Sequence, residues 1–141
     1  MNYAAAMAEL ERRQHSAPDD YQIEIAMGLA AAGLGRAAEA IRHGERAVEL
    51  LPVTKDAAEG PLYLYLLAQI QSRVGQQIAA FATLDRMFSA PSFYNEWWVA
   101  RDPGLSALRA HPSYREHVDR WARSRGEALL VARGSVAPEQ R

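Results

Sequence analysis

Histidine and cysteine most often carry chemistry in proteins, and this sequence places neither in a reactive pattern. The chain contains no cysteine, which excludes disulfides, thiolate metal ligands and cysteine nucleophiles. His111 and His117 are six positions apart, and no two histidines have the i, i+4 spacing of a helical zinc site. His43 falls within a helical pattern, where we expect it on a solvated face. The sequence therefore predicts no metal site.

Patterns for phosphate binding and for acid–base catalysis are missing as well. The segment Gly33–Arg36 (GLGR) resembles a phosphate loop only superficially, because no strand precedes it and no Gly-Lys-Ser/Thr sequence ends it. The chain has 17 acidic residues, but the sequence marks no two of them as sharing a desolvated pocket. We therefore expect a protein that is not an enzyme and that uses no cofactor.

The charge and hydropathy of the chain argue against two classes of partner. The formal net charge is −1, so no overall field attracts nucleic acid or an anionic membrane. Acidic residues interleave with the arginines of 115–133, which favours ion pairs on a solvated helix over a nucleic-acid stripe. No signal peptide is visible, and no apolar run approaches the roughly 20 residues that span a bilayer. We expect a cytoplasmic protein with no nucleic-acid or membrane partner.

The rest of the chain is organised around a helix, a turn and a second helix at 21–52. Ile25 and Leu29 recur at helical spacing before Gly33–Gly35, and apolar residues recur in the same way after it. Glycine favours the left-handed backbone that ends a helix, so the chain can reverse within few residues. This pattern predicts two antiparallel helices.

Small residues at fixed offsets strengthen that prediction. Gly28, Ala40 and Ala47 carry almost no side chain, and two helices approach closely only where such residues meet. Pro52 cannot continue a helix and lies just beyond the second one. Together these residues resemble one tetratricopeptide repeat, a helix–turn–helix unit of about 34 residues. The resemblance implies an all-α fold in which antiparallel helix pairs stack into a right-handed superhelix.

A second unit of the same kind follows at 61–90. Gly75 comes 40 positions after Gly35, and small residues match at the same spacing. Helical periodicity in its second half predicts that Ile78 faces inward. The resemblance therefore covers two successive repeats.

The segments outside the two repeats have their own predictions. Residues 3–15 form a lone helix with Met7 and Leu10 as an apolar stripe, in the place of the second helix of an earlier repeat. Residues 92–133 depart from the repeat pattern, and we expect capping helices that cover the apolar face of the last repeat. We treat 1–133 as a single domain and expect 134–141 to be a disordered tail.

The C-terminal segment carries a second resemblance. It contains Asp102-Pro103, then Leu108-Arg109, then a proline two positions before Tyr114. A similar Asp-Pro…Leu-Arg…Pro-Arg-Phe pattern ends the tetratricopeptide regions of large bacterial proteins that carry a kinase, cyclase or winged-helix domain. This chain departs from the pattern, with a Ser-Tyr pair in place of Arg-Phe. The resemblance implies a bacterial regulatory or signalling protein, and none of those catalytic domains is present in this sequence.

In tetratricopeptide arrays the first helix of each repeat lines a concave face, and the resemblance implies this role here. These positions are mostly apolar or neutral, which disfavours a clamp for a terminal carboxylate and suits a helix or an extended peptide. The groove is open only if the C-terminal helices leave it uncovered. The predicted groove residues are Gln22, Ile25, Leu29, Leu62, Tyr65, Gln69 and Arg73.

Trp97 and Trp98 have two interpretations. Both can belong to the core, where terminal helices cap the last repeat. Adjacent residues cannot share one helix face, however, so one indole can point outward as an anchor for a partner or a second copy. Met7 and Leu10 are the other candidate interface residues, because an unpaired first helix can pack on another copy.

Three functions remain open at this point. The first is a non-catalytic module that binds a protein or peptide partner. The second is homo-oligomerisation through the terminal helices, which would give a homodimer. The third is a small-ligand sensor, which requires an enclosed polar pocket.

Overall fold

The computed structural model describes residues 2–90 and 92–132, with the side chains of 128–132 excluded. Within these residues every regular element is a helix, so the predicted all-α fold class is confirmed. The predicted tail at 134–141 lies outside the described residues. The helices are α1 (Tyr3–Ser16), α2 (Tyr21–Gly33), α3 (Ala37–Leu50), α4 (Gly60–Arg73), α5 (Gln77–Phe88), α6 (Glu96–Arg101), the 3₁₀ helix η1 (Pro103–Leu105), α7 (Ser106–Arg109) and α8 (Tyr114–Ala132).

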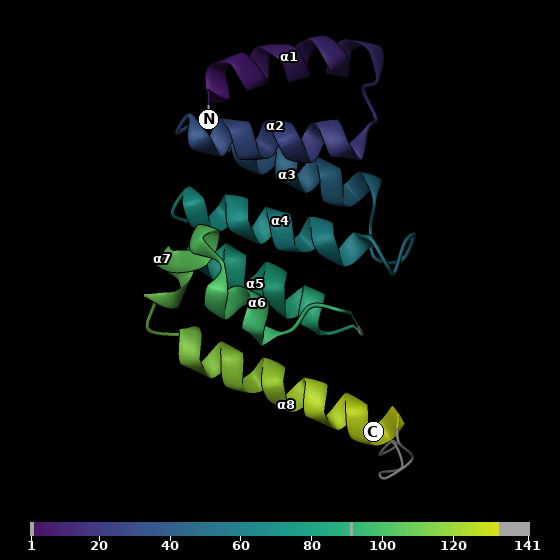
Figure 1. Ribbon diagram of the computed structural model, residues 1–141, viewed down its shortest axis with the longest axis vertical. Coiled ribbons are helices and arrows are strands. Elements are labelled where there is room, and N and C mark those ends of the chain that lie inside the picture. Colours follow the sequence, from purple (N-terminus) through teal and green to yellow (C-terminus); the bar gives the residue numbers. More distant parts are fainter. Residues whose placement is uncertain (1, 91, 133–141) are drawn as a thin grey trace.

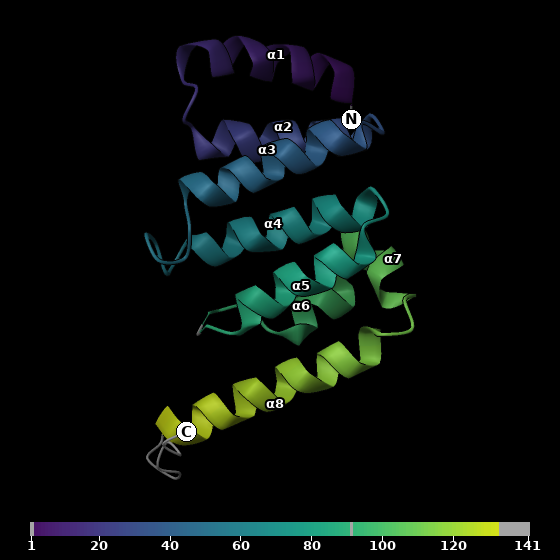
Figure 2. The same cartoon turned by 180° about the vertical axis from the view of Figure 1, so that it is seen from behind.

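The helices stack in layers along the long axis of the molecule, in the order of the sequence. Figure 1 shows α1 at one end and α8 at the other. The two helical hairpins, α2 with α3 and α4 with α5, lie between these ends. Seen from one side, α2, α4 and α6 are in front, whereas α3 and α5 are in front from the other side (Figures 1 and 2). The arrangement is an all-α helical-repeat fold.

The first hairpin follows directly from its sequence. The Asp20 carboxylate caps α2 by accepting hydrogen bonds from the backbone amides of Gln22 at 2.8 Å and Ile23 at 3.3 Å. Gly35 ends the helix with a φ of 75°, the left-handed conformation that glycine tolerates best. The chain then reverses into α3 within three residues.

Close packing of this hairpin depends on Gly28. A Cβ atom at this position would lie 2.8 Å from Ile70 Cδ1, 3.1 Å from the Ala40 carbonyl oxygen and 3.2 Å from the Gly44 nitrogen. The last two atoms belong to the backbone of α3 and cannot move independently of that helix. The small residues therefore let α2 contact α3 and the next hairpin at the same point.

We expect Gly28→Ala to lower the free energy of unfolding by about 1–3 kcal/mol, because the crowding of α3 outweighs the better helix propensity of alanine. Gly126 in α8 is the matched control, since no described atom lies within 4 Å of a Cβ built there. Gly126→Ala should raise the free energy of unfolding by about 0.5–1 kcal/mol. Urea denaturation followed by circular dichroism measures both. Equal effects of the two substitutions would contradict the packing argument.

The second hairpin has the same helix–turn–helix form as the first, but different residues make its buried polar contact. Gly75 takes a φ of 89°, as Gly35 does in the first hairpin. The prediction for Ile78 was wrong, because its side chain is 70% exposed on α5. The Thr83 hydroxyl donates a buried hydrogen bond to Gln71 Oε1 at 2.7 Å, which joins α5 to α4. Thr83 comes 40 positions after His43, so the second helix of each hairpin carries a buried polar link at the equivalent position, although the partners on the first helix are not equivalent.

The first hairpin uses an ionisable pair for this link. His43 Nδ1 lies 2.7 Å from Glu24 Oε2, and both side chains are buried. Gln14 Nε2 donates to the other carboxylate oxygen at 2.5 Å. The expectation that His43 is solvated was therefore wrong. Glu24 of α2 joins α1 and α3 in one network, which satisfies a carboxylate that would otherwise be costly to bury.

The C-terminal segment packs on the second hairpin in two ways. Val99, Leu105 and Leu108 are fully buried, and η1 and α7 lie against α4. The long helix α8 lies against α5 at the end of the stack (Figures 1 and 2). The segment therefore covers the apolar surface that α4 and α5 would otherwise leave open.

Asp85 of α5 is the main polar anchor of α8. Its Oδ1 accepts hydrogen bonds from Trp121 Nε1 at 2.7 Å and Arg120 Nη2 at 3.2 Å, and lies 3.1 Å from His117 Nδ1. Partial burial of Asp85 raises its pKa, but the hydrogen bonds from Trp121, His117 and Arg120 and the charge of His117 outweigh this, so the pKa lies below its ordinary value.

This lowered pKa predicts how the stability of the fold depends on pH. Ionised Asp85 stabilises the fold above the unfolded-state pKa of 3.8, and that contribution is lost as the pH falls through the lower folded-state value. Asp85→Asn should therefore destabilise the chain by up to about 1 kcal/mol at pH 6, a value limited by solvent screening, and by less at pH 3. Urea midpoints at the two pH values measure this. An equal loss at both would contradict it.

No described helix is both long and apolar enough to cross a membrane.

Candidate functional site

Asp102, between α6 and η1, is the polar centre of the best-formed hollow. Its Oδ2 accepts a hydrogen bond from the Tyr65 hydroxyl at 2.5 Å and another from Gln69 Nε2, both from α4. Its Oδ1 accepts the backbone amide of Gly104 at 2.7 Å, which caps η1. Burial of Tyr65, with the bond to Asp102, raises the tyrosine pKa. One carboxylate thus fastens the C-terminal segment to the second hairpin.

Arg109 completes this attachment from α7. Its Nη1 donates to the carbonyl oxygens of Val99 at 2.9 Å and of Asp102 at 2.5 Å. Pro103 starts η1, and Leu108 is fully buried next to Arg109 in the sequence. The residues of the Asp-Pro…Leu-Arg pattern therefore act together to hold α6, η1 and α7 in place. The pattern has a structural role here.

A hollow of about 710 Å³ lies beside this centre, and we call it the α4–α6 hollow. Trp97 is 60% exposed and Trp98 is 55% exposed at its edge. Arg101 lies over the Trp97 ring, with its Cζ 3.7 Å from the ring centroid. The lining residues are Tyr65, Gln69, Asn95, Trp97, Trp98, Arg101, Asp102 and Pro103.

A chain of aromatic contacts supports the exposed indoles. The Tyr94 ring stacks on Tyr65 with centroids 5.5 Å apart, and it also contacts Trp98 at 5.6 Å. Asn95 caps α6 by accepting the Trp97 amide at 3.0 Å. Because Tyr65 is itself buried and bonded to Asp102, the Trp98 indole rests on a fixed base.

Some charged side chains near the α4–α6 hollow have hydrogen-bond partners within the chain, and Arg101 has no carboxylate partner in the part of the chain that the structure describes. Asp102 has three donors from this chain, as described above. Glu96 accepts Arg125 Nε of α8 at 3.1 Å, and this hydrogen bond keeps the pKa of the Glu96 carboxyl below its ordinary value. Arg101 is exposed and has no carboxylate partner among the described residues. The hollow therefore has one unpaired guanidinium at its rim.

The structure separates the predicted groove residues into three groups. Ile25 and Tyr65 are buried, so they support the helical stack instead of presenting a free surface. The side chains of Leu29, Leu62 and Gln69 are half-buried, and those of Gln22 and Arg73 are exposed. Tyr65 and Gln69 lie together, and Trp98 and Asp102 of the C-terminal segment bond to them. Of the two alternatives left open by the sequence, the C-terminal segment covers the groove at Tyr65.

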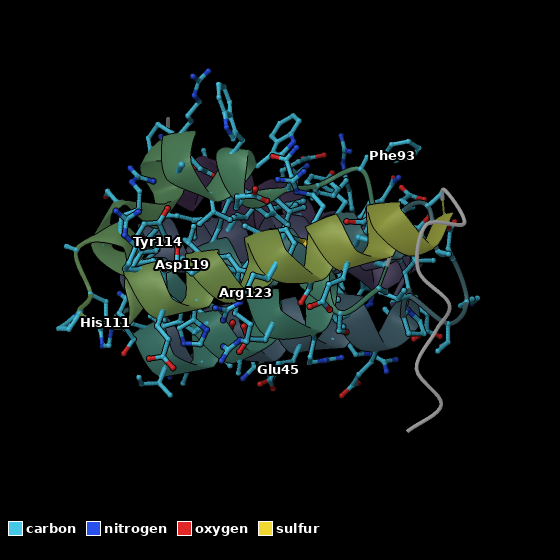
Figure 3. The ribbon with its side chains drawn as sticks, turned by 90° about the horizontal axis from the view of Figure 1, so that it is seen from below. Glu45, Phe93, His111, Tyr114, Asp119 and Arg123 are labelled. Atoms are coloured by element: carbon cyan, nitrogen blue, oxygen red, sulfur yellow. The ribbon has the colours of Figure 1, made fainter. Side chains whose placement is uncertain are left out.

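The candidate interface residues also differ in their exposure. Met7 is buried against the core and Leu10 is half-buried, so the face of α1 that carries them already packs within this chain. Neither tryptophan of the Trp97-Trp98 pair belongs to the core, which corrects the capping interpretation for these two side chains. Phe93 is 90% exposed, and Figure 3 shows it on the opposite side of the molecule from Glu45 of α3.

Four lining residues were missed by the sequence reasoning: Asn95, Arg101, Asp102 and Pro103. A signal for Arg101 was present, because it follows Trp97 by four positions and residues at this spacing share a helix face. The position of Asp102 against α4 depends on a contact across more than thirty residues, which no local pattern reveals.

The described residues hold no group of three or more histidine and acidic side chains that could bind a metal ion. The Glu24–His43 pair is buried among helices and connects them, so it lacks access for a substrate. The α4–α6 hollow offers aromatic faces, one guanidinium and an occupied carboxylate. This arrangement can bind an apolar group and an adjacent anion.

Comparisons of the chain with models of protein families, with curated proteins and with solved structures find no match. The function is therefore inferred from the geometry of the α4–α6 hollow.

Proposed function

We propose that this chain is a non-catalytic protein-interaction module that binds a peptide segment of a partner protein at the α4–α6 hollow. The observation that carries the proposal is the pair of half-exposed indoles, Trp97 and Trp98, beside Arg101 at the rim of the hollow. Tryptophan and arginine dominate the binding energy of protein interfaces when they surround a pocket. Large exposed aromatic surface costs a lone chain solubility and is typical of an interaction site.

The architecture supports this role. Stacked helical hairpins give a rigid frame, and a tetratricopeptide array is the family that the spacing of Gly28, Ala40 and Gly75 favours. The Asp-Pro…Leu-Arg resemblance supports a place in a bacterial regulatory or signalling protein of the cytoplasm. The binding surface that we propose lies on α6 and its junction with α4, and it includes Tyr65 and Gln69 of the predicted groove.

A peptide-display selection tests the proposal. Random peptides are selected on the immobilised full chain and, in parallel, on a Trp97→Ala/Trp98→Ala variant. We expect enriched peptides on the wild type and a loss of at least about tenfold in affinity on the variant, because two anchors are removed. Ile78→Ala is the matched control and should bind as the wild type does, because this exposed side chain belongs to α5, and α5 lies in front of α6 in Figure 2. Failure to enrich any peptide, or equal binding to all three proteins, would refute the proposal.

Two other functions have a specific observation in their favour. The exposed aromatic surface can also contact a second copy, and light scattering would then give twice the mass of 15.6 kDa. A hollow of about 710 Å³ is also within the range of small-ligand sites. A monomeric mass at every concentration removes the first alternative. Binding of peptides but not of small aromatic compounds removes the second.

A further inference from the structure

The side chain of Arg101 is held in a fixed position without a partner for its hydrogen bonds. Its guanidinium carbon lies 3.7 Å from the centroid of the Trp97 ring. Stacking uses the flat face of a guanidinium and leaves the N–H groups at its edge free to donate. No described residue accepts a hydrogen bond from the Arg101 side chain. The group is therefore oriented in advance to bind an acceptor that comes from another molecule.

The local charge favours an anionic acceptor. Asp102 is the carboxylate of the hollow, and Tyr65, Gln69 and Gly104 already occupy its two oxygens. Arg109 lies on the inner side of the same centre and offsets the charge of Asp102. Arg101 then remains as an uncompensated positive charge at the rim.

Other charged groups close to the hollow do not change this sign. Glu96 of α6 is paired with Arg125 of α8. Arg73 is exposed one helical turn beyond Gln69 and adds a second positive charge on the same face of α4. The aromatic surface of Trp97 and Trp98 lies directly beside Arg101. The geometry therefore places the apolar surface of Trp97 and Trp98 next to the Arg101 guanidinium, which can bind a carboxylate.

We infer that the partner segment carries an aspartate or glutamate next to an apolar side chain. The apolar side chain packs against Trp97 and Trp98, and the carboxylate forms a bidentate ion pair with the edge of the Arg101 guanidinium. This inference rests on the proposed function and names the chemistry of the partner. It places recognition on α6 and its junction with α4.

The charge of the selected peptides tests this inference. Random dodecapeptides displayed on phage are selected on the full chain, on Arg101→Glu and on Arg42→Glu. Arg42 is an exposed arginine of α3, which lies on the opposite face of the molecule, and it serves as the matched control. Since both substituted side chains are exposed, each variant should fold, which circular dichroism checks.

On the wild type and on Arg42→Glu we expect peptides with an acidic residue beside an apolar one. On Arg101→Glu the acidic bias should disappear or change to lysine and arginine, and the best wild-type peptide should lose about tenfold in affinity. An enriched set without acidic bias, or an acidic bias that persists on Arg101→Glu, would overturn the inference while leaving the proposed function intact. No enrichment on the wild type would refute both.

Discussion

Replacing Asp102 by alanine is expected to lower the free energy of unfolding by about 3 kcal/mol. The substitution removes the acceptor of three hydrogen bonds and leaves the buried Tyr65 hydroxyl with only a long contact of 3.4 Å to the Trp98 carbonyl oxygen. Bonds to a charged group contribute about 1.5–3 kcal/mol, and a buried donor left with only a long contact adds its own cost. Urea denaturation followed by circular dichroism measures the loss.

The control for this experiment is Asp119→Ala on α8. Asp119 is an exposed aspartate with no hydrogen-bond partner among the described residues, and its removal should change stability by less than about 0.5 kcal/mol. A loss at Asp102 no larger than that at Asp119 would show that the carboxylate does not attach the C-terminal segment. Peptide binding should also weaken in Asp102→Ala, because Trp97 and Trp98 are carried by the released helix α6.

Replacing His43 by alanine should have the largest effect on stability, about 3–5 kcal/mol. Glu24 would keep its bond to Gln14 and lose its partner on α3, and removing one partner of a buried polar pair leaves the other group unsatisfied. A cavity adds to the cost. His15→Ala on the exposed face of α1 is the matched control and should be close to neutral. Thermal and urea unfolding measure both variants.

A double variant tests whether the effect of replacing His43 comes from the loss of its contact with Glu24. In His43→Leu/Glu24→Leu both polar partners become apolar, and such replacements are often neutral or stabilising in other proteins. We therefore expect the double variant to be more stable than His43→Ala. If the losses in the free energy of unfolding of His43→Leu and Glu24→Leu simply add in the double variant, the pair contributes through packing alone. That result would contradict the argument from the buried Glu24 side chain.

The helices were predictable from the sequence because their ends are coded locally. Asp20 caps α2, the two glycines Gly35 and Gly75 take positive φ after α2 and α4, and the spacing between them gives the second hairpin. Each of these signals acts within a few residues. The positions of the helices therefore required no knowledge of the tertiary structure.

The faces of the helices were much less predictable. Tyr65 is covered by a segment that follows it by more than thirty residues, and His43 is buried because Glu24 needs a partner across the hairpin. Ile78 has the periodicity of a core residue but lies where no later helix covers α5. Which face is covered depends on contacts between distant segments, and a single sequence does not encode these in a readable pattern.

Helix α4 has a position that affects how the two ends of the molecule influence each other. It packs against α2 and α3 on one side and against α5, η1 and α7 on the other. Gly28 of the first hairpin contacts Ile70 of α4, and Tyr65 of the same helix bonds to Asp102. Helix α4 therefore links the packing of the N-terminal hairpin to the attachment of the segment that carries the indoles, so both ends of the stack depend on the position of this helix.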